Sequence, residues 1–360
     1  MMRRVLLLLM TLFMIFSLFV GCTKEDTAIQ ETGSNELSNE ANEANENHEA
    51  NEEDSDNNNS NETSNNYTAL ADEVIVEDES VTFVDALDQE VTIQKKPERV
   101  ICLFNSYLDL WYLSGGEVIG RIESRDKVPE GAMEAEIVGT MTSPNMEKII
   151  SLEPDLVILR PGMRGQSEII PILEENEIPY LGIEYDNLEQ YLYAIRLFTA
   201  INERDDLYQK NGLDITKQVE EIVNKVPKDE EPTVLLMFAS TRNVSVKFQN
   251  SFVGDMLHDL GTVNIAYDAQ LTNEEMEVFS MEKVIERDPE YILVQTMGDV
   301  DNIKDKLIKD VESNPAWESL TAVKEGKYIF LPKDLYLYKP NEKYPEAYRG
   351  LAEILYPDTF

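Results

Sequence analysis

Histidine and cysteine are scarce in this sequence, which has two of each in 360 residues. Two cysteines cannot form a disulfide framework, and two histidines cannot supply the ligands of a structural zinc site or of a histidine-rich metal receptor. Basic residues are also few, because 31 Lys and Arg stand against 70 Asp and Glu and give a formal net charge of -39. A chain this acidic is not expected to bind nucleic acid. The apolar share of 42% nevertheless suffices for a substantial core.

An apolar run over residues 5–20 follows two arginines and leads into Gly21 and Cys22. The run is shorter than a membrane-spanning helix requires, and its flanks are typical of a secretory signal peptide over residues 1–22. Its ending, F-V-G-C, resembles the lipobox of bacterial lipoproteins. That resemblance implies that Cys22 carries fatty acyl chains such as palmitate and becomes the mature N-terminus at the extracytoplasmic face of the cell membrane. The alternative is an uncleaved membrane anchor, which places the body of the protein on the same side.

Residues 23–72 are dominated by Asn, Glu, Ser and Asp and include the low-complexity run E-A-N-E-A-N-E-N. Such a segment cannot bury enough apolar surface to offset its chain entropy, so a disordered, self-repelling acidic tether is expected. The rest of the chain is also strongly acidic. The lipid on Cys22, rather than basic side chains, is therefore expected to hold the protein at the membrane.

Strand patterns alternate with helix patterns over the rest of the chain. The expected strands span residues 99–104, 118–122, 156–159, 180–183, 233–238, 263–267, 291–294 and 327–331. A hairpin with its turn at Asp88 precedes them at residues 81–93. This order predicts an α/β fold of three-layer αβα lobes with mainly parallel sheets.

The sequence contains an internal repeat. Residues 145–159 read N-M-E-K-I-I-S-L-E-P-D-L-V-I-L and residues 280–294 read S-M-E-K-V-I-E-R-D-P-E-Y-I-L-V, so Met, Glu, Lys, Ile and Pro coincide. Two similar lobes are therefore expected, an N-terminal lobe at residues 73–201 and a C-terminal lobe at residues 228–360. Between them, residues 202–227 combine helix formers with apolar spacing and end at a proline, which predicts one long rigid connecting helix.

The lipid anchor, the tether, the paired lobes and the connecting helix together resemble the substrate-binding lipoproteins of ABC importers, in particular their iron-siderophore, heme and cobalamin branch. The resemblance also includes N-P-A-W-E-S-L-T-A-V-K-E-G-K-Y-I-F-L and E-A-Y-R-G-L-A-E-I-L-Y-P. It implies a non-enzymatic, monomeric receptor that delivers its ligand to a permease and an ATPase. In this family one Glu of each lobe docks onto permease arginines, and the matching positions are Glu147 and Glu282. The alternative is that each carboxylate only complements the positive end of its own helix dipole.

Loops at the carboxyl ends of the strands are expected to line a ligand cleft between the lobes. The candidate lining side chains are mostly aromatic, thioether or cationic, and they are Tyr107, Met141, Arg160, Met163, Arg164, Arg242, Phe248, Met297, Tyr336 and Tyr338, with Phe104, Asn105, Ser106, Thr142 and Lys247 beside them. Such a lining suits a large anionic iron chelate whose carboxylates pair with arginine.

Three ligands compete for this cleft. A ferric siderophore ranks first, because it needs no metal ligand from the protein. Heme ranks second, since Met141 or Met163 and Met297 could supply thioether ligands to its iron, although methionine at a loop tip is often only soft packing. Cobalamin ranks third, and no resident cofactor is expected.

Two functions of other classes stay open, a surface sensor or adhesin and a carboxylate-dependent extracellular enzyme. The sequence has no nucleophile elbow, phosphate loop or Ser-His-Asp set, and only His258 is available outside the tether.

Overall fold

The computed structural model describes residues 67–124, 128–266, 276–278, 281–298 and 300–360. The expected signal peptide, Cys22 and most of the expected tether lie outside the described residues. Within them, none of the helices combines the length and the apolar character needed to cross a membrane.

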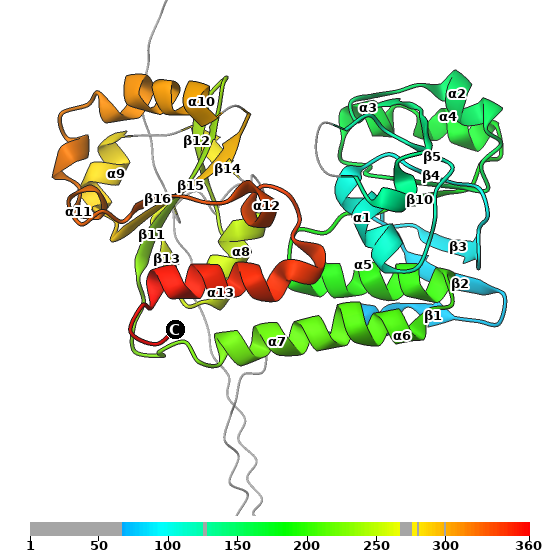
Figure 1. Ribbon diagram of the computed structural model, residues 1–360, viewed down its shortest axis with the longest axis horizontal. Helices are drawn as coiled ribbons and strands as arrows, with labels where there is room; N and C mark the ends of the chain where they lie inside the picture. The colour runs from blue at the N-terminus through cyan, green and yellow to red at the C-terminus, as the bar shows by residue number, and fades with distance from the viewer. Residues whose placement is uncertain (1–66, 125–127, 267–275, 279–280, 299) are drawn as a thin grey trace, which may run out of the picture. The chain divides into compact units, whose positions relative to one another are not determined.

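A five-stranded parallel sheet forms the centre of the N-terminal lobe (Figure 1). In spatial order its strands are β10 (Tyr180–Gly182), β9 (Leu156–Leu159), β4 (Val100–Cys102), β5 (Gly120–Arg121) and β6 (Glu136–Ile137). Side chains alternate between its faces, so Val100 packs into one hydrophobic core while Ile101 packs into another. The central strands β4 and β9 are buried on both faces, which explains why they read as continuous apolar runs. The parallel pairing confirms the predicted parallel sheet.

Two small antiparallel units accompany this sheet. The predicted hairpin is present as β2 (Ser80–Val84) and β3 (Glu90–Gln94), extended by β1 (Ile75–Val76). Asp88 adopts a φ of 57° in its turn, a conformation that Asp tolerates better than most residues. The second unit pairs β7 (Gly139–Thr140) with β8 (Ser143–Pro144).

The sheet of the C-terminal lobe is mixed. Its strands are β14 (Met276–Val278), β12 (Val244–Lys247), β11 (Thr233–Ser240), β15 (Tyr291–Met297) and β16 (Tyr328–Phe330), with β13 (Val263–Asn264) paired to β11. The strands β11, β13, β15 and β16 are parallel and confirm the expected ones. The antiparallel strands β12 and β14 were not expected from the sequence.

Helices flank the central sheet of each lobe (Figure 1). The α-helices are α1 (Asn105–Leu113), α2 (Met146–Ser151), α3 (Arg164–Ser167), α4 (Ile170–Glu175), α5 (Leu188–Ile201), α6 (Asp205–Tyr208), α7 (Asp214–Val223), α8 (Phe252–Asp259), α9 (Met281–Arg287), α10 (Val300–Leu307), α11 (Thr321–Lys324), α12 (Lys333–Tyr336) and α13 (Tyr344–Leu355). Short 3₁₀ helices lie at Ala71–Glu73, Glu130–Ala132, Trp317–Ser319 and Asn341–Lys343, and π-helical turns at Gln209–Leu213 and Ile308–Glu312.

The two copies of the sequence repeat have the same backbone course. Each runs from a helix, α2 or α9, into a strand of the central sheet, β9 or β15. The equivalent residues Glu153 and Asp288 both adopt positive φ, 46° and 39°, immediately before a proline. The residues after that proline, Asp155 and Glu290, both accept backbone N–H bonds at the start of the neighbouring strand. These shared details confirm that the repeat is structural as well as sequential.

The connecting helix is shorter than predicted and is not a uniform α-helix. It consists of α6, the π-helical turn and α7, and therefore begins at Asp205 and ends at Val223. A side chain at Gly212 would lie 3.0 Å from Leu192 of α5, so a glycine allows the helices to approach closely. The widened turn presents the carbonyl of Asn211 to the buried Tyr191 hydroxyl at 2.5 Å.

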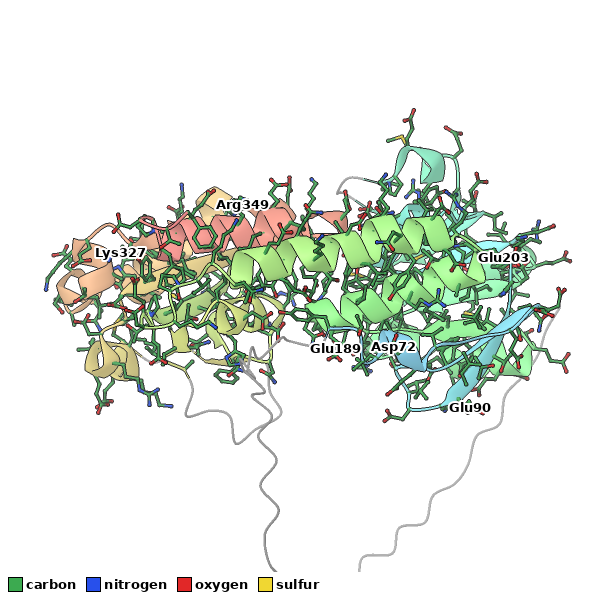
Figure 2. The ribbon with its side chains drawn as sticks, turned by 90° about the horizontal axis from the view of Figure 1, so that it is seen from below. Asp72, Glu90, Glu189, Glu203, Lys327 and Arg349 are labelled. Carbon is green, nitrogen blue, oxygen red and sulfur yellow. The ribbon has the colours of Figure 1, made fainter. Side chains whose placement is uncertain are left out.

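One hydrophobic core joins the two lobes. Its members include Val100 and Leu156 of the first sheet, Leu236 and Leu293 of the second, and buried residues of α5, α7 and α13. The helices α7 and α13 run side by side in both views (Figure 1, Figure 2). Because inner faces of both sheets share this core, large independent movements of the lobes would expose apolar surface.

The expected end of the tether at residue 72 lies too late in the chain. Tyr67 and Ala71 are buried in the shared core, and the Tyr67 hydroxyl donates to Asp259 Oδ2 at 2.9 Å. The apolar residues of Y-T-A-L-A explain this, since they let the chain pack before the first strand begins. Later in the chain, charged side chains such as Asp72, Glu90 and Glu203 lie at the surface (Figure 2).

Candidate ligand cleft between the lobes

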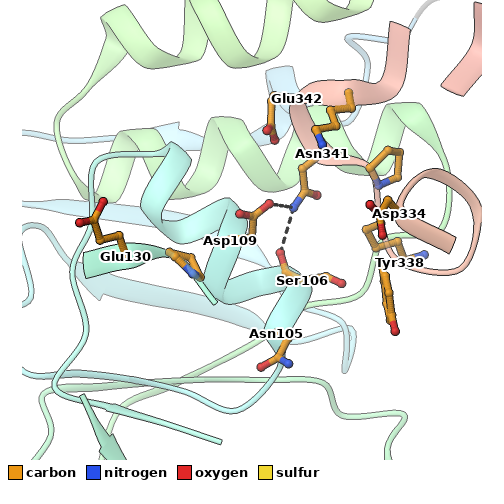
Figure 3. Close-up of a pocket in the computed structure, with 12 residues that line it drawn as sticks. Asn105, Ser106, Asp109, Glu130, Asp334, Tyr338, Asn341 and Glu342 are labelled. Atoms are coloured by element: carbon orange, nitrogen blue, oxygen red, sulfur yellow. Dashed lines mark hydrogen bonds between the residues drawn. The ribbon is translucent and has the colours of Figure 1, made fainter. Parts of the chain in front are cut away.

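A cavity of about 500 Å³ opens where the two lobes meet (Figure 3). The N-terminal lobe contributes the start of α1 and the loop at Pro129 and Glu130, while the C-terminal lobe contributes the segment from Asp334 to Lys343. Its volume falls within the range of about 300–1,000 Å³ that is typical of small-molecule sites. The lining residues are Asn105, Ser106, Asp109, Pro129, Glu130, Asp334, Tyr338, Lys339, Pro340, Asn341, Glu342 and Lys343.

Asn341 connects the lobes at the base of this cavity. Its side chain is fully buried, and its φ of 50° is one that asparagine tolerates. Its amide nitrogen donates to Asp109 Oδ2 at 2.8 Å and to the Ser106 carbonyl at 3.1 Å, and its oxygen accepts from the Tyr185 hydroxyl at 2.7 Å. A buried amide satisfied in this way fixes the relative position of the groups that it bonds.

Asp186 is surrounded by cations from both lobes. Lys339 of the C-terminal lobe forms an ion pair with it, and Arg160 of the N-terminal lobe lies 3.5 Å away. Burial alone would raise the pKa of Asp186, but Lys339 and then Arg160 outweigh it and hold that pKa below its ordinary value. Arg160 also lies 3.5 Å from Glu184, and Lys339 lies 4.7 Å from the centre of the Phe252 ring. The charges of both cations are therefore largely compensated within the protein.

The structure brings some predicted cleft residues to the cavity and places others in the core. Tyr338, Asn105 and Ser106 line the cavity, and Tyr338 is 37% exposed. Three other residues that were predicted to line the cleft are instead buried, so this prediction is wrong for Tyr107, Phe248 and Tyr336. Each follows a strand as expected, but its ring points into a hydrophobic core. The Tyr336 hydroxyl, for example, donates to the Ala347 carbonyl at 2.9 Å.

The predicted methionines differ in how far they are available to a ligand. Met297 ends β15 and is 51% exposed. Met141 is half-buried and packs against the outer core of the N-terminal lobe. Met163 is also half-buried, and its sulfur accepts a hydrogen bond from Gln166 Nε2 at 3.5 Å.

The predicted cations of the cleft have distinct environments. Arg164 is exposed and pairs with Glu168 at 2.9 Å, while Arg242 lies exposed in the turn between β11 and β12. Lys247 ends β12 with its ammonium 5.7 Å from the centre of the Phe238 ring. Phe104 is half-buried under the Arg160 guanidinium at 5.5 Å, and Thr142 is exposed.

The remaining predicted residues lie away from the cavity. Glu147 and Glu282 are both exposed in the first turn of their helices, α2 and α9, at equivalent positions of the repeat. His258 is exposed on α8. Cys102 is buried in β4, and burial raises its pKa to about 12.

Sequence reasoning missed the polar residues of the cavity, above all Asp109, Lys339 and Asn341, and the adjoining Asp186 that pairs with Lys339. The run K-P-N-E-K at 339–343, between the last strand and the last helix, was the available signal, because it concentrates charge and a turn-forming Asn beside the predicted Tyr338. Among the described residues, no group of three His, Cys, Asp or Glu side chains could hold a bare metal ion.

Two lobes with a shared core and a cavity at their junction define a solute-binding protein. The model of the periplasmic binding protein family matches residues 100–335, and the chain belongs to that family. The uncharacterized ABC transporter substrate-binding lipoprotein YvrC of Bacillus subtilis is 27% identical over 291 residues, covering 78% of this chain and 87% of that protein. The Fe(3+)-citrate-binding protein YfmC of the same organism is 24% identical over 252 residues, covering 68% of this chain and 76% of that protein.

Solved structures agree on the fold. The crystal structure of Staphylococcus aureus IsdE complexed with heme matches with a TM-score of 0.63 at 18% identity, covering 72% of this chain and 98% of that chain. YvrC is named as a substrate-binding lipoprotein of an ABC transporter and YfmC as a binding protein, and both names agree with the expected class of protein.

Proposed function

We propose that this protein is the lipid-anchored receptor of an ABC importer and binds a ferric siderophore between its lobes. The observation that carries the proposal is the cavity that both lobes line, where an exposed aromatic ring and charged side chains can surround a chelate without supplying a metal ligand. The iron-citrate chelate in the name of YfmC, a relative that the chain matches over most of its length, supports an iron chelate as the cargo.

Delivery of the cargo requires attachment and docking. Lipidated Cys22 would hold the protein at the extracytoplasmic membrane face through the acidic tether, and Glu147 and Glu282 would contact arginines of the permease, whose ATPase drives import. Both carboxylates are exposed at equivalent positions of the repeat. Exposed carboxylates and arginines form bidentate, charge-assisted hydrogen bonds.

Heme is the second candidate ligand, and Met297 favours it. This side chain is 51% exposed at the carboxyl end of β15, where its thioether could reach a heme iron. If heme binds there, Met297→Ala should shift the Soret band of the complex, and an unchanged band would remove Met297 from the iron.

Titration of the purified full-length chain in detergent with ferric siderophores, hemin and cyanocobalamin tests the proposal. Calorimetry and visible absorption should show saturable binding of a ferric siderophore at one site. Binding of hemin or of cyanocobalamin alone would replace the siderophore by the second or third candidate. Indifference to every chelate would favour a sensor or adhesin, and turnover of an added substrate would indicate an extracellular enzyme.

A further inference from the structure

The cavity between the lobes is lined by more carboxylates than ammonium groups. Asp109, Glu130, Asp334 and Glu342 line it, against Lys339 and Lys343. Lys339 directs its ammonium to Asp186, so its charge is compensated by a carboxylate outside the lining. The four carboxylates and two ammonium groups give the lining a net negative formal charge.

The nearby arginine does not reverse this balance. Arg160 lies between Glu184 and Asp186, at 3.5 Å from an oxygen of each. A guanidinium held between two carboxylates offers little attraction to an added anion, because it must first give up one of these contacts. This finding argues against the expectation that arginine and anionic groups pair at this part of the cleft.

The cavity also offers an aromatic face. Tyr338 is 37% exposed beside Asp334 on one side, while Asp109 and Glu130 lie on the opposite side (Figure 3). An exposed aromatic ring with carboxylates around it is the combination that binds organic ammonium groups, through cation–π attraction and charge pairing. Because Asn341 fixes Asp109 across the lobes, this arrangement is already formed without a ligand.

We infer that the cavity binds a positively charged, ammonium-bearing end of the imported chelate, beside Tyr338 and between the carboxylates of Asp109, Asp334 and Glu342. This inference rests on the proposed function, and it narrows the ligand to a ferric chelate with a cationic arm. A chelate that carries carboxylates or a net negative charge would meet repulsion at the same place.

The test compares ferric trihydroxamates that share one iron centre and differ only at a terminal amine, which is left as an ammonium, acetylated or succinylated. Calorimetric titration of the full-length chain in detergent should give affinities that fall in this order, by roughly tenfold from the first to the last, which corresponds to one strong ionic contact. The difference in affinity between the ammonium and succinylated forms should decrease as the salt concentration is raised, because mobile ions screen the carboxylates. Ferric citrate serves as the anionic reference.

Matched variants connect the effect to the cavity. Asp334→Asn combined with Glu342→Gln should reduce the difference between the ammonium and succinyl forms to less than about threefold, because it removes two charges of the lining without changing its size. Glu221→Gln combined with Glu318→Gln neutralises two exposed carboxylates outside the lining and should leave the order intact. Equal thermal melting of the variants would show that both fold.

The outcomes separate the inference from the function on which it rests. Tighter binding of the succinylated form or of ferric citrate than of the ammonium form, or equal binding of all three forms, would overturn the inference and leave a ferric chelate as the cargo. Failure of every ferric chelate, together with saturable binding of hemin or cyanocobalamin, would overturn the proposed function and the inference together.

Discussion

The two lobes share a backbone plan but differ in the walls that they present to each other. In both, a short helix leads through a positive-φ residue and a proline into a parallel strand. The central sheet of the N-terminal lobe is wholly parallel, whereas the C-terminal lobe adds the antiparallel strands β12 and β14. The cavity segment 334–343 belongs to the C-terminal lobe alone. In it, Lys339 pairs with Asp186 and Asn341 donates to Asp109, both of the N-terminal lobe.

The comparison distinguishes the features that both copies of the repeat share from the features that form the cavity. The shared features lie at the joins between helix and strand, where a change would disturb the register of a buried sheet. The differences lie in loops and at a sheet edge, where side chains can change without loss of the core. The chemistry of the cavity therefore belongs to the differences, and the equivalent positions of Glu147 and Glu282 belong to the shared plan.

The largest expected effect that tests the equivalence of the two lobes concerns Glu147 and Glu282, the proposed docking carboxylates. Replacing both Glu147 and Glu282 by Ala should reduce uptake of the chelate by cells to background while leaving its affinity for the purified protein unchanged. Each single replacement should give a similar partial loss of about 10–100-fold, since a charge-assisted hydrogen bond contributes about 1.5–3 kcal/mol. The measurement is uptake of radioactive iron by a strain that carries the variant.

Glu286→Ala, which removes an exposed carboxylate from the same helix as Glu282, serves as the control and should not affect uptake. Unchanged uptake by the double variant would refute the docking assignment. A loss caused by only one of the single variants would show that the equivalence of the two copies does not extend to the permease.

Two half-buried carboxylates, one in each lobe, should respond to pH with opposite sign. Asp186 has a lowered pKa, so its contribution to stability is present above its unfolded pKa and is lost only as the pH falls through the folded value. Asp255 of the C-terminal lobe differs, because burial first, and then Asp259 and Glu189, raise its pKa to about 7. The folded protein therefore binds a proton that the unfolded chain releases, and stability should rise as the pH falls from about 7 toward 4.

Asp255→Asn should remove this rise, which is on the order of 3 kcal/mol because one unit of pKa shift corresponds to about 1.4 kcal/mol. The measurement is the free energy of urea unfolding at pH 5 and at pH 8, with the exposed Asp229→Asn as the control. An equal dependence on pH in Asp255→Asn and in the parent protein would exclude Asp255 as its source.

Local patterns predicted the parallel strands, the repeat and the hairpin turn at Asp88, since each depends on residues close in sequence. The strands β12 and β14 escaped prediction because their pairing at the sheet edge depends on tertiary contacts. Likewise, no local signal places Asn341 beside Asp109, more than 200 residues earlier. The rule that ligands lie at strand ends found the correct loops but not the direction of each side chain, so Tyr107 and Phe248 were assigned to the cleft although both are buried.

The smallest expected effect compares the two repeat copies at one equivalent carboxylate. Asp155 accepts N–H groups of Glu98 and Arg99 at 2.7 and 2.9 Å, whereas Glu290 accepts one backbone N–H, that of Thr233, at 2.9 Å. We expect Asp155→Ala to lower the free energy of urea unfolding by about 1–2 kcal/mol and Glu290→Ala by about 0.5–1 kcal/mol, because an exposed hydrogen bond contributes about 0.5–1 kcal/mol, the lower part of the range for intramolecular hydrogen bonds. Asp155→Asn and Glu290→Gln keep an acceptor oxygen, so each should lose less stability than the corresponding alanine variant. A greater loss for Glu290→Ala would show that side-chain packing, rather than the number of backbone bonds, determines how each copy holds its strand.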